Sequence, residues 1–194
     1  PMPAILIPTT EFFDPVIYAI KTPDFNENQK EYIIFNSMLN YINELLQKEI
    51  NNNKRAKGSI SNIKFSPALT DVAFLIVQKV PHTKEIDALY KKVIINLKKT
   101  FSGNNNEQNI NSNKILQQIT DSWINKQFYN WQDNKTQVQQ MHKGIELLQD
   151  TNHANLYLDE FECIINATIQ DYANILSYFD DVPQLRLYSD TSKK

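Results

Sequence analysis

Residues 83–103 carry the clearest periodic pattern in the chain, and it is the pattern of an amphipathic helix. Apolar residues recur there at spacings of three, four and seven, which places them along one side of a helix. These residues are Ile86, Tyr90, Val93, Ile94, Leu97 and Phe101. Thr83 is expected to cap the start of the helix, and Gly103 to end it. One face of this helix is therefore predicted to be buried.

Three further segments carry a helical period. Residues 26–50 and 155–179 hold long apolar stripes, and residues 113–131 hold another. The last period weakens near Asp133 and resumes over 138–148, which predicts either one long helix or two joined ones.

Two shorter segments are also predicted to be helical. Residues 9–20 offer Asp14 as a cap and Pro15 at the first helical position. Residues 66–80 are apolar nearly all round, which is typical of a centrally buried helix. A buried strand over 72–77 is the alternative, because short apolar runs fit either structure.

Together these segments predict an all-α fold. The chain has three glycines in 194 residues, fewer than the turns of a β-rich fold of this size usually require. We expect an irregular helical bundle or a short α-superhelical stack of about six to seven helices. Residues 1–182 would form a single helical domain, with mobile loops at 51–65 and 102–112 and a C-terminal tail at 183–194.

Charge is distributed unevenly along the chain. The net charge is −2, but residues 48–99 contain eleven Lys or Arg against four Asp or Glu. Both flanks are acidic. A basic middle between acidic flanks favours an acidic partner for the middle, or helices that pair with one another.

The basic residues of the middle third predict a partner-binding surface. Lys84, Lys91 and Lys98 recur at seven, and Ile95 lies among them as an apolar residue in a lysine stripe. The full candidate surface is Lys54, Arg55, Lys57, Lys84, Lys91, Lys92, Ile95, Lys98 and Lys99. The alternative is a solvated helix face with one stray isoleucine.

Three classes of partner suit such a surface. Another protein, through an acidic peptide or helix, is the first. An anionic membrane surface is the second, since clustered lysines are attracted to charged headgroups. Nucleic acid is the third, and the presence of one Arg in the basic block and the acidic chain overall count against it.

An aromatic cluster near residue 130 is a second candidate contact. Phe128, Tyr129 and Trp131 cannot all face the same side of a helix. Tyr129 and Trp131 are therefore candidate contact residues for a binding partner, because exposed aromatic residues often anchor interfaces. A purely structural role in the core is the alternative.

Catalytic and metal-binding motifs are missing from the sequence. It contains no phosphate-binding glycine loop and no nucleophile elbow. His82, His142 and His153 are never four residues apart, so no helical zinc motif is formed. Cys163 is the sole cysteine, which excludes an internal disulfide. We therefore predict no enzyme activity, no metal and no cofactor.

These observations lead to one functional prediction. The chain is expected to be a non-enzymatic adaptor or scaffold domain of a larger protein that binds a partner peptide or helix. A peripheral membrane adaptor and a nucleic-acid-associated module are the alternatives. The lone cysteine and the lack of a signal peptide favour a cytoplasmic or nuclear location in a reducing compartment, and Asn-rich loops are common in eukaryotic genomes. The oligomeric state stays open.

Overall fold

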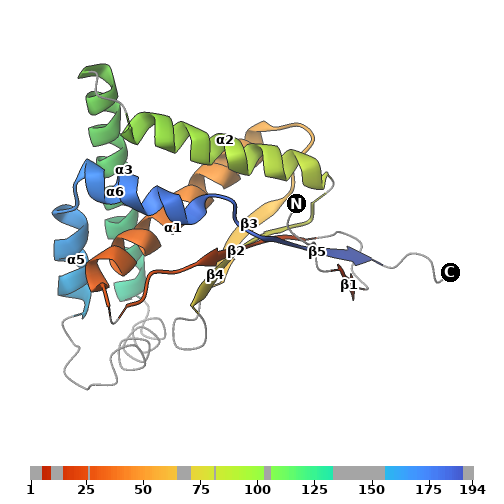
Figure 1. Cartoon of the computed structure of the whole chain (residues 1–194), viewed down its shortest axis with the longest axis horizontal. Coiled ribbons are helices and arrows are strands. Elements are labelled where there is room, and N and C mark those ends of the chain that lie inside the picture. Colours follow the sequence, from red (N-terminus) through yellow and green to blue (C-terminus); the bar gives the residue numbers. More distant parts are fainter. Residues whose placement is uncertain are drawn as a thin grey trace.

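The chain forms a mixed α/β structure with a sheet on one side and helices on the other (Figure 1). The computed structural model describes residues 6–9, 15–25, 27–64, 71–80, 82–102, 106–132 and 156–189. Within these residues, no helix has the length and hydropathy needed to cross a membrane.

Five strands of the described part form one sheet, with the order β1-β5-β2-β4-β3. The strands are β1 (Leu6–Thr9), β2 (Val16–Lys21), β3 (Ile60–Lys64), β4 (Val72–Gln78) and β5 (Gln184–Ser189). The pairs are antiparallel, except that β1 and β5 run parallel. The prediction of an all-α fold, as a bundle or superhelical stack, is therefore wrong.

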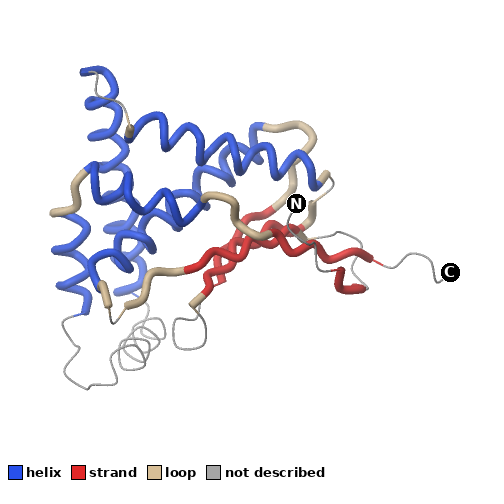
Figure 2. The backbone as a smooth tube through the Cα atoms, viewed as in Figure 1, coloured by secondary structure: helices blue, strands red, loops and turns tan. Residues whose placement is uncertain are grey.

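The helices pack against one face of this sheet and against each other (Figure 2). They are α1 (Gln29–Asn52), α2 (Thr83–Phe101), α3 (Asn106–Gln132), α5 (Leu156–Ile165), α6 (Ile169–Ile175) and the 3₁₀ helix η2 (Leu176–Phe179). The long central helix α1 contacts β3, α2, α3, α5 and α6. The helix is therefore buried on more than one side. This accounts for the burial of Ile33, which lies outside the main row of apolar residues on α1.

The alternation of buried side chains along β2 and β4 shows how the core forms. Val16, Tyr18 and Ile20 of β2 are fully buried, and they lie beside Val77, Leu75 and Ala73 of β4 in the register of the two strands. Successive strand residues face opposite sides of a sheet, so these six form one apolar surface beneath the helices. Their neighbours in sequence, such as Ile17 and Phe74, are half-buried on the opposite face.

Aromatic side chains join the sheet to the helices. The ring of Tyr18 stacks on Tyr90 of α2 with centroids 4.3 Å apart. Phe35 of α1 stacks on Phe179 of η2 at 5.2 Å. Offset stacking of this kind adds to the free energy gained from burial alone, by about 0.5–1.5 kcal/mol per pair.

Two predicted helices are strands instead. Residues 9–20 contain β2, and residues 66–80 contain β4, so the strand alternative for 72–77 is the correct one. The strand in each segment is a short continuous apolar run, over 16–20 and 72–77, in which the helical and strand periods cannot be told apart. Cross-strand pairing between them decides the outcome.

The predicted loops and tail also contain regular structure. The segment 51–65 holds the end of α1, a turn and β3, and Gly58 in that turn has a φ of +97°, which favours glycine. Most of 102–112 belongs to α3. Residues 184–189 of the predicted tail form β5, which pairs with β1 and β2, and residues 190–194 lie outside the described residues.

The helical predictions are confirmed for 26–50, 83–103 and 113–131, with shifted ends. His82 rather than Thr83 is the N-cap residue of α2, without a capping side-chain bond. The predicted helix over 155–179 is broken before Thr168, whose hydroxyl accepts from the Asp171 amide and starts α6. Asp14, Gly103 and the segment 138–148 lie outside the described residues.

Candidate functional site

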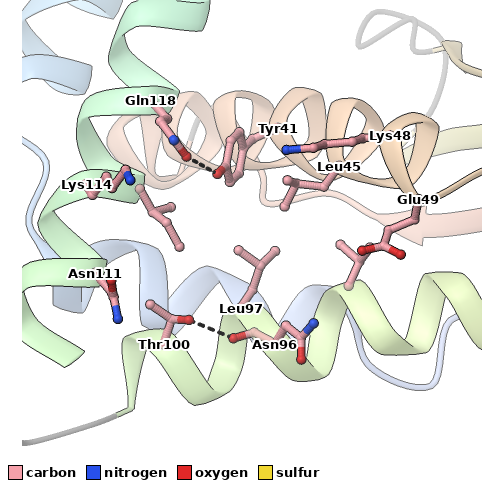
Figure 3. Close-up of a pocket in the computed structure, with 12 residues that line it drawn as sticks. Tyr41, Leu45, Lys48, Glu49, Asn96, Leu97, Thr100, Asn111, Lys114 and Gln118 are labelled. Carbon is pink, nitrogen blue, oxygen red and sulfur yellow. Dashed lines mark hydrogen bonds between the residues drawn. The ribbon is translucent and has the colours of Figure 1, made fainter. Parts of the chain in front are cut away.

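A pocket of about 370 Å³ lies where α1, α2 and α3 meet (Figure 3). Each helix contributes one face to it. Its twelve lining residues are Tyr41, Leu45, Lys48, Glu49, Val93, Asn96, Leu97, Thr100, Asn111, Lys114, Ile115 and Gln118.

The floor of this pocket, which we call the three-helix pocket, is apolar. It consists of Leu45, Val93, Leu97 and Ile115. Val93 and Leu97 are buried in the core and fix the position of α2, whereas Leu45 and Ile115 are half-buried. The helical spacing of four between Val93 and Leu97 places both on the side of α2 that faces α1.

The rim of the three-helix pocket is polar. The Tyr41 hydroxyl donates to the Gln118 side-chain oxygen at 2.7 Å and ties α1 to α3. Burial raises the pKa of Tyr41, and the carboxylate of Glu44 adds to this effect. Thr100 donates to the Asn96 carbonyl at 2.9 Å within α2.

The charged residues of the rim differ in their pairing. Glu49 accepts from Lys92 at 2.7 Å, which closes one end of the pocket with a neutral pair. Lys48 and Lys114 are exposed, and neither has an ion-pair partner among the described residues. They lie on either side of the Tyr41–Gln118 pair (Figure 3). The pocket therefore combines an apolar floor with two unpaired positive charges.

The residues of the predicted basic surface lie on two neighbouring elements. Lys54, Arg55 and Lys57 lie in the turn after α1, which Asn53 joins to the start of α2 by donating to Glu85 at 2.6 Å. The remaining residues lie along α2.

The lysines of α2 lie around the side of the helix that is not buried. Lys92 and Lys99 directly precede the pocket-lining residues Val93 and Thr100. Lys84, Lys91 and Lys98 fall on the other side of the helix, since successive residues are turned by about 100°. Lys98 is paired with Asp180, and Lys92 with Glu49.

Ile95 is half exposed, as the prediction of a contact residue requires, with 50% of its surface accessible. Tyr129 and Trp131 fall in the last turns of α3, where their side chains lie outside the described residues. Neither the basic surface nor these aromatic residues is tested by the structure, and both stay predictions.

The prediction missed the residues that build the three-helix pocket. Lys48 and Lys114 stand 66 positions apart in the sequence. Each of these two lysines stands at helical spacing from an apolar residue. This spacing indicates that the lysine lies at the edge of a buried helix face. No local signal indicates that the two edges meet, because the packing of α1 and α3 brings them together.

A metal site is not formed by the described residues. No three His, Cys, Asp or Glu side chains among them are grouped so that they could hold a metal ion. His82 is exposed at the start of α2, and Cys163, whose pKa burial raises, is a free thiol. In the whole sequence no two histidines stand four residues apart.

No protein-family model and no curated protein sequence matches the chain. Solved structures do resemble it. One is the inactive peptidase domain of a protein assigned as a zinc protease, from Bordetella parapertussis, with a TM-score of 0.62 and 12% identity over 93% of this chain and 94% of that one. Another is a protease from Helicobacter pylori, with a TM-score of 0.63 and 13% identity over 95% of this chain and 44% of that one.

A third similar structure is a protein predicted to be an insulinase family protease, from Yersinia pestis. It has a TM-score of 0.61 and 11% identity over 100% of this chain and 43% of that one. The chain thus spans nearly all of the Bordetella domain and less than half of the two longer proteins. At such low identity the resemblance concerns the fold.

This fold corrects the functional prediction. A non-enzymatic adaptor or scaffold domain, with its membrane-adaptor and nucleic-acid alternatives, was inferred from an all-α architecture. The architecture is instead a mixed α/β fold similar to that of the three structures above, which are described as proteases or as a peptidase domain. The prediction of no enzyme activity was made from missing motifs, and it is contradicted by the similarity in fold to structures described as proteases.

Proposed function

We propose that the chain is a peptidase-type domain that works in a zinc protease of the insulinase type. It would help to hold the polypeptide substrate, and the metal ligands would come from outside the residues described here. The observation that carries this proposal is the match along nearly the whole chain to a domain that is itself a peptidase domain.

Two further observations support a shared site rather than a complete one. The described residues offer no group of metal donors, so they do not fit a catalytic zinc ion, which needs three protein ligands and an open position. The longer similar proteins leave more than half of their length uncovered by this chain, which is room for a second domain of similar size. The domain's contribution to proteolysis is thus binding and positioning of the polypeptide.

A cytoplasmic or nuclear location and an acidic protein partner belong to this proposal as predictions. They depend on the charge distribution and the lone cysteine.

The proposal is tested by recovering the tagged chain from its native cells in mild conditions. We expect the recovered complex to cleave a quenched fluorescent peptide, and a zinc chelator to abolish the cleavage. The recombinant chain alone serves as the comparison, and a mock recovery from untagged cells as the control. A native complex without chelator-sensitive cleavage contradicts a role in a zinc protease.

A further inference from the structure

We infer that the three-helix pocket is a docking site for an acidic peptide segment, in which one apolar side chain enters the floor and flanking carboxylates meet Lys48 and Lys114. This inference rests on the proposed function, since it names the class of polypeptide that the domain would hold. It depends on three properties of the pocket.

The first property is the apolar floor. Leu45, Val93, Leu97 and Ile115 surround a space of about 370 Å³, at the lower end of the range of ligand pockets. Burial of an apolar side chain there would remove both its surface and that of Leu45 and Ile115 from water. The floor therefore selects for one aliphatic or aromatic side chain.

The second property is the charge of the rim. Lys48 comes from α1 and Lys114 from α3, so the two ammonium groups approach the pocket from different helices (Figure 3). Neither has an ion-pair partner among the described residues, whereas Lys92 and Lys98 have one each. The one acid on the rim, Glu49, is paired with Lys92. The remaining charge is positive, which is complementary to carboxylates.

The third property is the supply of amide groups. Asn96, Asn111 and Gln118 stand on the rim, from α2 and α3. Side-chain amides donate and accept hydrogen bonds, as the main chain of a peptide does. A peptide fits such a rim better than a lipid headgroup, which offers no main-chain amides, or a nucleic acid, which requires a larger basic surface.

The inference differs from the sequence-based prediction of the binding surface. Lys84 and Lys91 lie on the side of α2 away from the pocket and have no part in it. Lys48 and Lys114, which that prediction left out, supply the charge.

The test measures fluorescence anisotropy of a labelled Glu-Glu-Leu-Glu-Glu peptide with the recombinant full chain, at about 0.15 M salt, where charges are screened over about 8 Å. We expect Lys48→Glu with Lys114→Glu to raise the dissociation constant about tenfold or more. Lys21→Glu with Lys64→Glu, at exposed positions of β2 and β3 outside both the pocket and the predicted basic surface, is the matched control, with the same change of net charge. It should alter the constant by less than about twofold, because these residues are remote from the pocket.

A second arm keeps the protein unchanged and varies the probe. Replacing the central Leu by Gly should weaken binding about tenfold, because the floor then stays empty. Circular dichroism checks that the variants, all at exposed positions, are folded.

Three results would overturn the inference. They are no saturable binding of the peptide, equal loss in both double variants, or stronger binding to phosphatidylserine vesicles or to oligothymidylate than to the peptide. Failure of this test leaves the chelator-sensitive cleavage by the native complex unaffected, so the two proposals fail separately.

Discussion

Asp171 shows how single side chains fix the ends of the shorter helices. Its carboxylate accepts from the Lys30 ammonium at 2.9 Å and from the Thr168 amide and hydroxyl at 2.8 Å each. The bond from Lys30 is the main cause that lowers the pKa of Asp171, with the bonds from Thr168 acting in the same direction. This one group therefore starts α6 and joins it to α1.

Replacing Asp171 by Asn should lower the free energy of unfolding by about 1 kcal/mol at pH 7. Lys30 is half exposed, so solvent screens its share. The lowered pKa means that the stabilisation is present above the unfolded-state pKa of about 3.9 and is lost as pH falls through the folded-state value. The free energies of unfolding of the wild type and of Asp171→Asn, measured with urea, should therefore become equal in acid.

Asp159→Asn, at an exposed position of α5, is the control and should change the free energy of unfolding at pH 7 by less than about 0.5 kcal/mol. A difference between Asp171→Asn and wild type that is as large in acid as at neutral pH would contradict the role given to the carboxylate.

Gln47 is a second residue whose side chain has a defined structural role. β3 stands at the end of the strand order, so one side of it has no neighbouring strand among the described residues. The Gln47 side chain accepts from the Ser61 amide at 2.8 Å and donates to the Ser59 carbonyl at 3.2 Å. The side-chain amide thus takes the place of a strand residue, and it closes an edge that would otherwise invite pairing with another chain.

Gln47→Leu should lower the free energy of unfolding by about 1–3 kcal/mol, because two main-chain groups lose their partner. The substitution should also increase aggregation through the edge of β3, measured as light scattering on storage. Gln170→Leu, at an exposed position of α6, is the matched control. Unchanged stability and scattering in Gln47→Leu would show that the edge needs no cover.

At the scale of elements, the period of the sequence predicts α1 and α2, because their buried residues recur at helical spacing.

Two adjacent isoleucines of α2 test which face of this helix is buried. Ile94 is 5% exposed and Ile95 is 50% exposed. Ile94→Ala should cost about 2–5 kcal/mol of unfolding free energy, and Ile95→Ala less than about 0.5 kcal/mol. Similar losses in thermal or urea unfolding of the two variants would contradict this placement.

Other elements are not predictable from local pattern. The residues of β2 and β4 are apolar in succession, so burial on both sides hides the period of two. The break before α6 depends on the bond between Thr168 and Asp171, inside an apolar stripe that continues past it. The pairing of β1 with β5 joins Leu6 to Arg186, and no short-range signal connects residues so distant.

The three-helix pocket can be predicted from the sequence only in part. The sequence indicates the helix faces from which Lys48 and Lys114 project, because both helices are amphipathic. It does not indicate how α1, α2 and α3 cross, since that depends on the sheet beneath α1. The prediction from charge and helical spacing selected residues that lie close together in sequence, within 54–57 and 84–99.

At the scale of the whole molecule, the fold is similar to that of a peptidase domain, and the described residues contain no metal site. The chain would then act with metal ligands supplied from elsewhere. Purified recombinant chain, incubated with zinc and dialysed, gives the most direct measurement when its zinc content is read by mass spectrometry. We predict a zinc content far below one ion per chain, unchanged in His82→Ala. One tightly held zinc ion per chain would contradict the account.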